Sequence, residues 1–250
     1  MASRREEKDR LREERLAAER QTSAAARKRL LFGYIVAGVL GVAVIGGVIV
    51  AVVSGGGNSG GAGSDGGPNV NTMYGVVPKG LDVDNREGTP PPEIQDGNLT
   101  SAADTAGCDL QLNLKDEGNT HVDPPVPASL PKYGTNPPTS GNHYPTPLAD
   151  GAFLEEPPVG NFVHSIEHGR IEIQYNPDLS EADQLALKGV FDSDRPGMIM
   201  FPNPDMPYDV ATTAWTQLMG CKSFDGDATL DAIRDFRDEY RGRGPEAIAF

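Results

Sequence analysis

The chain has 250 residues and a formal net charge of −14, a length that suits one or two domains. The charge is divided unevenly, because residues 1–29 hold 10 Lys and Arg against 6 Asp and Glu, whereas residues 54–250 hold 12 against 30. Residues 54–250 therefore lack the cluster of basic side chains that phosphate binding requires, which excludes nucleic acid as their partner.

Residues 30–53 form an apolar segment without a single charged residue. A bilayer core of roughly 30 Å needs about 20 apolar residues in a helix, so the segment predicts one transmembrane helix. Its apolar run is too long for an ordinary cleaved signal peptide, which favours a signal-anchor, with cleavage near Ser54 as the alternative. Three basic residues, Arg27, Lys28 and Arg29, precede it. By the positive-inside rule we expect a single-pass protein of the cell membrane, with its N-terminus cytoplasmic and its main domain extracytoplasmic.

Small residues recur at every fourth position of this segment. Such ridges let two membrane helices approach closely and would allow a homodimer, although Gly and Ala are common in spanning helices generally. The residues concerned are Gly33, Ala37 and Gly41, and then Ala43, Gly47 and Ala51.

The rest of the chain divides by composition. We expect a basic cytoplasmic tail at 1–29, the membrane helix at 30–53, a Gly/Pro-rich flexible linker at 54–104 and an extracytoplasmic domain at 105–250. Eight glycines within residues 54–69 mark the start of the linker as a flexible tether.

Inside the domain, ten prolines between residues 121 and 160 predict a long irregular loop. Helices are predicted at 161–168, with Asn161 as N-cap and Gly169 as the stop, from Ser180 to about Phe191, at 210–219 and at 229–240. A half-buried strand is predicted at 171–175 and a buried one at 198–202. The predicted fold class is α+β: one transmembrane helix followed by a mixed α/β domain with a long Pro-rich loop region.

Two cysteines, Cys108 and Cys221, both follow the apolar segment. In an oxidising compartment such a pair is most simply a disulfide. A pair of thiolate metal ligands is the alternative.

All four histidines, His121, His143, His164 and His168, fall within 48 residues. His164 and His168 are four residues apart on a predicted helix, so their imidazoles lie on one face, close enough to share an ion. His121 and His143 come from the loop and would complete the site. Each histidine also has a simpler interpretation, as a buried hydrogen-bonded side chain, a helix C-terminal cation or an exposed loop residue.

Imidazole suits copper or zinc among other transition metals. Methionines in the same domain bring copper into consideration, although Met198 and Met200 lie in a strand-like apolar run that favours a core position. His164 to His168 also fits H-x-x-E-H, in which a glutamate acts as general base beside zinc. The predicted helix is short for that role, and Glu167 would equally orient an imidazole from behind the ligands.

Three blocks of sequence resemble a known bacterial family. They are Tyr133-Gly-Thr-Asn-Pro-Pro-Thr-Ser-Gly-Asn-His143, Val163-His-Ser-Ile-Glu-His-Gly169 and Ala214-Trp215. The chain resembles domain-of-unknown-function family 3105 from about residue 121 to residue 246. The resemblance implies the layout of tail, membrane helix and exported domain, and it supports the choice of the four histidines, but it implies no reaction.

The leading hypothesis is a membrane-tethered extracytoplasmic protein that captures, senses or delivers copper or zinc through a histidine cluster. A cell-envelope interaction or scaffold protein, with a protein partner on the Pro-rich loop and structural histidines, is the first alternative. A zinc-dependent hydrolase is the second. The pattern favours a binding protein over an enzyme.

Overall fold

The computed structural model describes residues 69–94, 97–123 and 132–249. All described residues belong to one compact unit. Four helices and one six-stranded sheet make up the part of the chain that is described.

The predicted fold class needs correction, because it began with a membrane-spanning helix. Among the residues that the structure describes, no helix is both long enough and apolar enough to cross a membrane. The segment for which that helix was predicted, residues 30–53, lies outside the described residues, as do the basic tail and the start of the tether. The architecture seen is a mixed sheet with helices on both faces.

The sheet has the order β1-β6-β5-β3-β4-β2. The pairs from β1 to β3 are antiparallel, and those of β4 with β3 and β2 are parallel. The strands are β1 (Cys108–Gln111), β2 (Gly151–Ala152), β3 (Ile171–Tyr175), β4 (Met198–Pro202), β5 (Val210–Ala214) and β6 (Gln217–Cys221).

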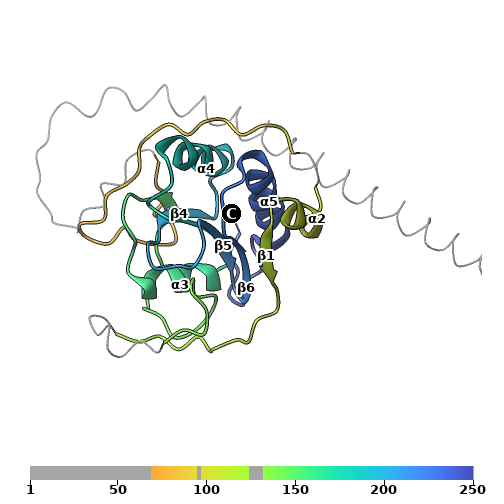
Figure 1. The fold of residues 1–250 in the computed structure, drawn as a ribbon. Helices are drawn as coiled ribbons and strands as arrows, with labels where there is room; N and C mark the ends of the chain where they lie inside the picture. The colour runs from red at the N-terminus through yellow and green to blue at the C-terminus, as the bar shows by residue number, and fades with distance from the viewer. Residues whose placement is uncertain (1–68, 95–96, 124–131, 250) are drawn as a thin grey trace, which may run out of the picture. The chain divides into compact units, whose positions relative to one another are not determined.

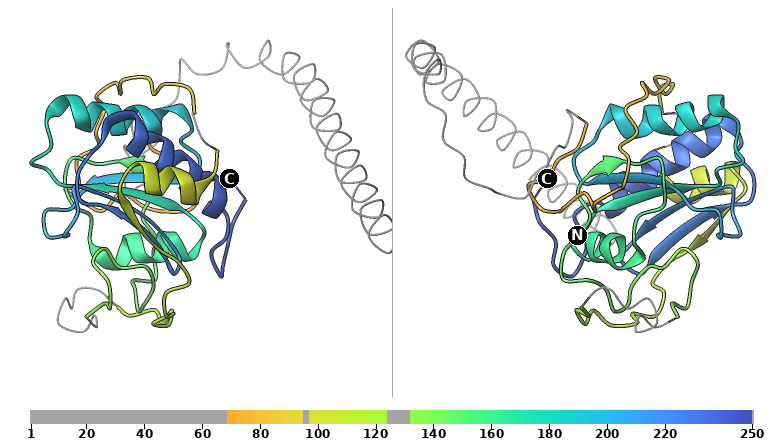
Figure 2. Two further views of the ribbon diagram at one scale, coloured as in Figure 1. Left: turned by 45° about the vertical axis from the view of Figure 1, so that its right-hand side comes forward. Right: turned by 90° about the vertical axis from the view of Figure 1, so that its left-hand side faces the viewer.

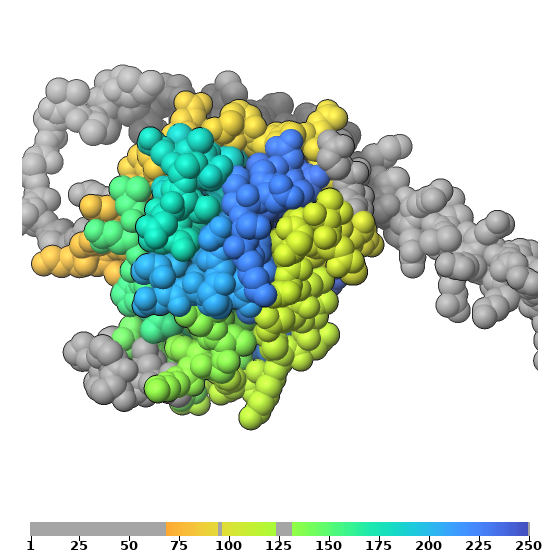
Figure 3. All heavy atoms as spheres, viewed as in Figure 1, coloured from red at the N-terminus to blue at the C-terminus, as the bar shows by residue number. Residues whose placement is uncertain are grey.

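The helices lie in two layers. Helices α2 (Leu99–Thr105), α4 (Glu181–Ser193) and α5 (Gly226–Tyr240) cover one face of the sheet, and α3 (Val159–Glu167) lies with the surrounding loops on the other (Figures 1 and 2). Figure 3 views the molecule from the side, with α4 and α5 in its upper part and the green loops below them.

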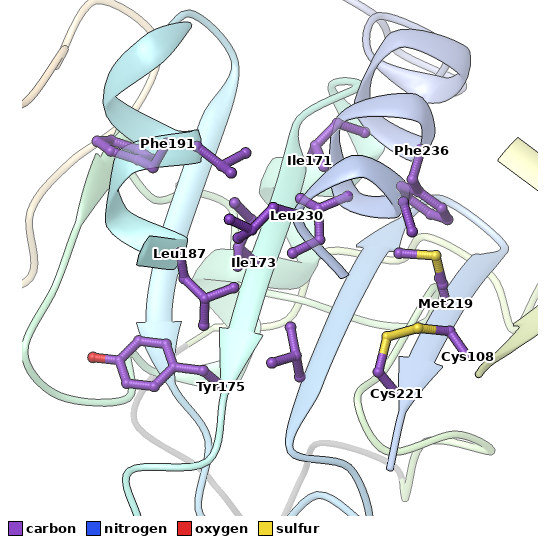
Figure 4. Packing of buried hydrophobic residues seen from close by; sticks show 14 of the residues in the cluster. Cys108, Ile171, Ile173, Tyr175, Leu187, Phe191, Met219, Cys221, Leu230 and Phe236 are labelled. Carbon is purple, nitrogen blue, oxygen red and sulfur yellow. A yellow bond between two sulfur atoms is a disulfide. The ribbon is translucent and has the colours of Figure 1, made fainter. Parts of the chain in front are cut away.

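Each layer has its own apolar core. On the α4–α5 side, Leu187, Phe191, Leu230 and Phe236 pack against β3, and the Cys108–Cys221 disulfide lies in the same cluster (Figure 4). On the α3 side, Phe162, Val163 and Ile166 pack with Ile199, Phe201 and Trp215. Burial of α3 against the sheet fixes the helix that carries His164 and ends at His168.

Two expected helix signals are confirmed. The Ser180 side chain accepts from the Asp183 amide and caps α4. Gly169 follows α3 with φ +83°, a conformation that glycine adopts without strain and that ends a helix. The start of α3 was placed too late, since Pro158 precedes its first turn, and the Asn161 side chain donates instead to the Thr146 carbonyl.

One helix prediction and one strand prediction need correction. Residues 210–219 lie in the β5–β6 hairpin and do not form a helix. Thr216 turns the hairpin with φ +60°, and the β-branched Thr212 and Thr213 favour the extended chain. Strand β3 is buried on both faces, not one, because α3 and its loops cover the side that carries Glu172 and Gln174.

Residues that we assigned to the linker contact the domain closely. Asn71 and Val83 form isolated bridges with Asp150 and Phe153, and the Thr89 amide donates to the Leu185 carbonyl at 2.8 Å. A Cβ on Gly189 would lie 1.6 Å from the Thr89 backbone oxygen. The segment around Thr89 can therefore pack this closely against α4 only because residue 189 is a glycine.

Candidate metal centre

Helix α3 supplies two buried polar side chains from its last turn. His164 and Glu167 are three residues apart, so both project from one side of the helix. His168 caps the helix, and its amide donates to the His164 and Ser165 carbonyls. The core contacts of Phe162, Val163 and Ile166 hold this turn in place.

The irregular loops bring the other two histidines over this turn. His121 and His143 form a parallel bridge, in which the Val122 amide donates to the His143 carbonyl at 2.8 Å. The Tyr144 amide then donates to the Gly160 carbonyl, which ties the loop to α3. The ring centroids of His121, His143 and His164 lie 4.6 to 5.0 Å from one another.

Three histidines have the same proton arrangement, set by backbone carbonyls. The Nδ1 atoms of His143, His164 and His168 lie 2.8, 2.6 and 2.8 Å from the carbonyl oxygens of Gly141, Tyr144 and Glu246. A carbonyl oxygen only accepts hydrogen bonds, so each Nδ1 carries the proton and each Nε2 of a neutral ring is left with its lone pair. This is the usual arrangement behind a metal-binding histidine.

These lone pairs face other lone pairs. The Nε2 atoms of His164 and His168 are 2.9 Å apart. The Nε2 of His143 lies 3.0 Å from Glu167 Oε2, and neither of these two buried atoms makes a hydrogen bond in the described structure. Burying acceptors against each other without a donor is costly. A proton or a cation between them would remove the conflict.

The second carboxylate oxygen of Glu167 is already engaged. Its Oε1 accepts from the Asn119 side chain at 2.8 Å, which turns Oε2 toward the histidines. Glu167 is 1 % exposed, His143 0 % and His164 3 %. A carboxylate so deeply buried needs a positive partner.

Burial also keeps the central rings neutral. It lowers the pKa of His143, against the opposing effects of the Gly141 hydrogen bond and of the neighbouring Glu167 carboxylate. It lowers the pKa of His164 to about 4, with the Tyr144 hydrogen bond opposing and the neighbouring histidines adding to the effect. At neutral pH both rings therefore offer lone pairs.

Four side chains form the compact group. His121, His143, His164 and Glu167 each present a donor atom within 4.8 Å of the others. His121 is exposed and the other three are buried, so the group opens to solvent on one side. His168, which we had also placed among the ligands, lies outside this group but beside His164, at 4.7 Å between ring centroids.

Sulfur ligands are absent from this group. Cys108 and Cys221 form the predicted disulfide. Met198, Met200 and Met219 belong to the core on the α4–α5 side of the sheet. The donors present are nitrogen and oxygen, which removes the thioether argument for copper.

Two neighbours of the group were not predicted to lie at the site. Asn119 orients Glu167, and Trp215 meets the His143 ring edge-on at 6.4 Å between centroids. Asn119 lies two residues before His121, but an isolated asparagine in a loop carries no recognisable signal. Trp215 was singled out only through the family resemblance.

Comparison with known proteins gives one family. Residues 128–249 match the family model described as "Protein of unknown function (DUF3105)". No curated protein and no solved structure matches the chain. The matched region contains His143, His164, Glu167 and His168, whereas His121 precedes it. Residues 128–249 thus match the model of the DUF3105 family of proteins of unknown function.

Proposed function

We propose that this domain binds one divalent transition-metal ion through His121, His143, His164 and Glu167. The observation that carries the proposal is the 3.0 Å approach of two buried acceptors, His143 Nε2 and Glu167 Oε2, without a hydrogen bond between them. A cation bound by both atoms satisfies them at once.

The donor set points to the class of ion. Three imidazoles and one carboxylate suit Zn²⁺ and Cu²⁺, and oxygen-preferring Mg²⁺ or Ca²⁺ much less. The lone pairs are already oriented by carbonyl partners, so little rearrangement is needed on binding. The exposed His121 supports reversible exchange of the ion with solvent, as capture or delivery requires. The disulfide supports a site of action outside the cytoplasm.

The contacts of Glu167 favour binding over hydrolysis. A general base beside a zinc ion needs a carboxylate that reaches a water. Here Oε1 is engaged by Asn119 and Oε2 faces His143 Nε2. This arrangement supports a ligand role for Glu167.

A matched pair of variants tests the proposal. Glu167→Gln removes the buried carboxylate charge, and Glu155→Gln makes the same change at an exposed position. Zn²⁺ and Cu²⁺ are titrated into chelator-treated protein, with calorimetry and elemental analysis as readouts. We expect one ion per chain in wild type and in Glu155→Gln, and an affinity at least 10-fold weaker in Glu167→Gln, as loss of even an outer partner costs about that much.

A scaffold protein with structural histidines gives a different result. Its thermal unfolding would be unchanged by chelation, and neither ion would bind. For a metal-binding domain, saturation at about 100 times Kd adds roughly 2.7 kcal/mol to the unfolding free energy. Equal, negligible metal content in wild type and in Glu167→Gln would refute the proposal.

A further inference from the structure

The segment that follows α5 lies against the end of α3 through its backbone. We call residues 242–248 the strap. The Gly242 amide donates to the Gly169 carbonyl at 2.8 Å, the Glu246 amide to the Glu167 carbonyl at 3.1 Å and the Ile248 amide to the His168 carbonyl at 3.3 Å. In the left view of Figure 2 the dark blue chain after α5 runs from the α4–α5 layer to the level of α3.

The same strap holds the His168 ring. The Glu246 carbonyl accepts a hydrogen bond from Nδ1 of His168 at 2.8 Å. This leaves the lone pair of Nε2 available to a metal ion, and Nε2 lies 2.9 Å from His164 Nε2. His168 is only half-buried and follows the last residue of α3. Without the strap its side chain would be free to turn to solvent.

The strap fits α3 only because a glycine stands at the contact. A Cβ on Gly244 would lie 2.1 Å from the Glu167 carbonyl oxygen and 2.6 Å from the Gly169 amide nitrogen. Both are backbone atoms, which cannot move aside cheaply. Any side chain at this position therefore pushes the strap, and with it the Glu246 carbonyl, away from His168.

We propose that the strap is a positioning element that brings His168 to the metal ion as a fifth ligand. This inference rests on the proposed function, since it assumes an ion at His121, His143, His164 and Glu167. The backbone of Glu246 acts through His168, and the strap thereby sets the affinity of the site. Displacing the strap lowers the affinity without removing any side chain that binds the ion.

A double-mutant cycle tests this. Zn²⁺ affinity is measured by competition with a chelator in wild type, Gly244→Ala, His168→Ala and the double variant. We expect Gly244→Ala to weaken binding 10- to 100-fold, as loss of an outer partner does, and to have an effect within about twofold in the His168→Ala background. Ala247→Ser is the control, because it changes an exposed side chain of the strap and so leaves affinity unchanged.

The outcomes separate the two proposals. An equal loss from Gly244→Ala with and without His168 would mean that the strap acts on Glu167 or on the fold, and would overturn the inference. Unchanged affinity in a folded Gly244→Ala variant would overturn it as well. Absence of Zn²⁺ binding in wild type would refute the proposed function instead. If Gly244→Ala does not fold, Ile248→Pro, which removes the amide donor to the His168 carbonyl, takes its place in the same cycle.

Discussion

Glu172 makes the stability of the metal-free domain depend on pH. It lies at the centre of the sheet on β3 and is fully buried. Its Oε2 accepts from Gln174 at 2.9 Å and from Thr213 at 2.8 Å, and no hydrogen bond reaches Oε1 within the described structure. Burial raises the pKa of this carboxyl from 4.5 to about 8, and the two hydrogen bonds oppose the rise.

The direction and size of the change in stability with pH follow from the linkage between proton binding and folding. The folded state keeps a proton that the unfolded chain releases near pH 4.5, so this stability is complete below pH 4.5 and is lost as pH rises through 8. Between pH 5.0 and 8.5 the loss is roughly 4 kcal/mol, at about 1.36 kcal/mol per pKa unit. Glu172→Gln keeps the shape and both hydrogen bonds but carries no ionisable proton, so it escapes the loss.

Urea unfolding at both pH values, with chelator present, measures the effect. His143 and His164, whose pKa is lowered, reduce the stability of the folded state as pH falls. Both wild type and Glu172→Gln contain these histidines, so their contribution cancels when the two proteins are compared. Glu172→Gln should gain roughly 4 kcal/mol on wild type between pH 5.0 and 8.5, and the exposed Glu155→Gln nothing. Parallel pH profiles for wild type and Glu172→Gln would show that Glu172 does not cause the loss of stability.

Three further predictions follow from single contacts. Asn119→Ala frees Glu167 Oε1, so Zn²⁺ affinity measured by calorimetry should fall about 10-fold; an unchanged affinity would contradict the orienting role. Replacing both Cys108 and Cys221 by serine opens a crosslink across 113 residues and should cost roughly 5 kcal/mol in urea unfolding, while one ion still binds per chain. Gly189→Ala places a Cβ against the Thr89 oxygen and should expose residues 88–94 to limited proteolysis at a rate that wild type does not show.

The elements that the sequence predicts well are those specified by local chemistry. Ser180 and Asp183 define a helix start within four residues, and Gly169 ends α3 in a conformation that glycine prefers. A helix was predicted wrongly at residues 210–219 because β5 and β6 are buried on both faces. The alternation of apolar and polar residues that marks a half-buried strand is therefore missing. The turn at Thr216 also lacks the Asn-Gly or Asp-Gly signature of a tight hairpin.

The candidate site was predictable in its side chains and not in its geometry. Four histidines in 48 residues are visible in the sequence, and Glu167 is visible beside two of them. The carbonyls of Gly141, Tyr144 and Glu246, which leave each Nε2 free, are backbone atoms that every residue possesses. They lie 2, 20 and 78 residues from the histidines that they bind, and only the folded domain specifies the two longer contacts.

X-ray absorption of the zinc-loaded, purified protein identifies the atoms that bind the ion. Since His121, His143, His164 and Glu167 converge, we expect one zinc ion per chain, bound by nitrogen and oxygen at about 2.0–2.2 Å, with outer-shell scattering from at least three imidazoles. A spectrum with sulfur in the first shell, or with one imidazole or none, would contradict this expectation.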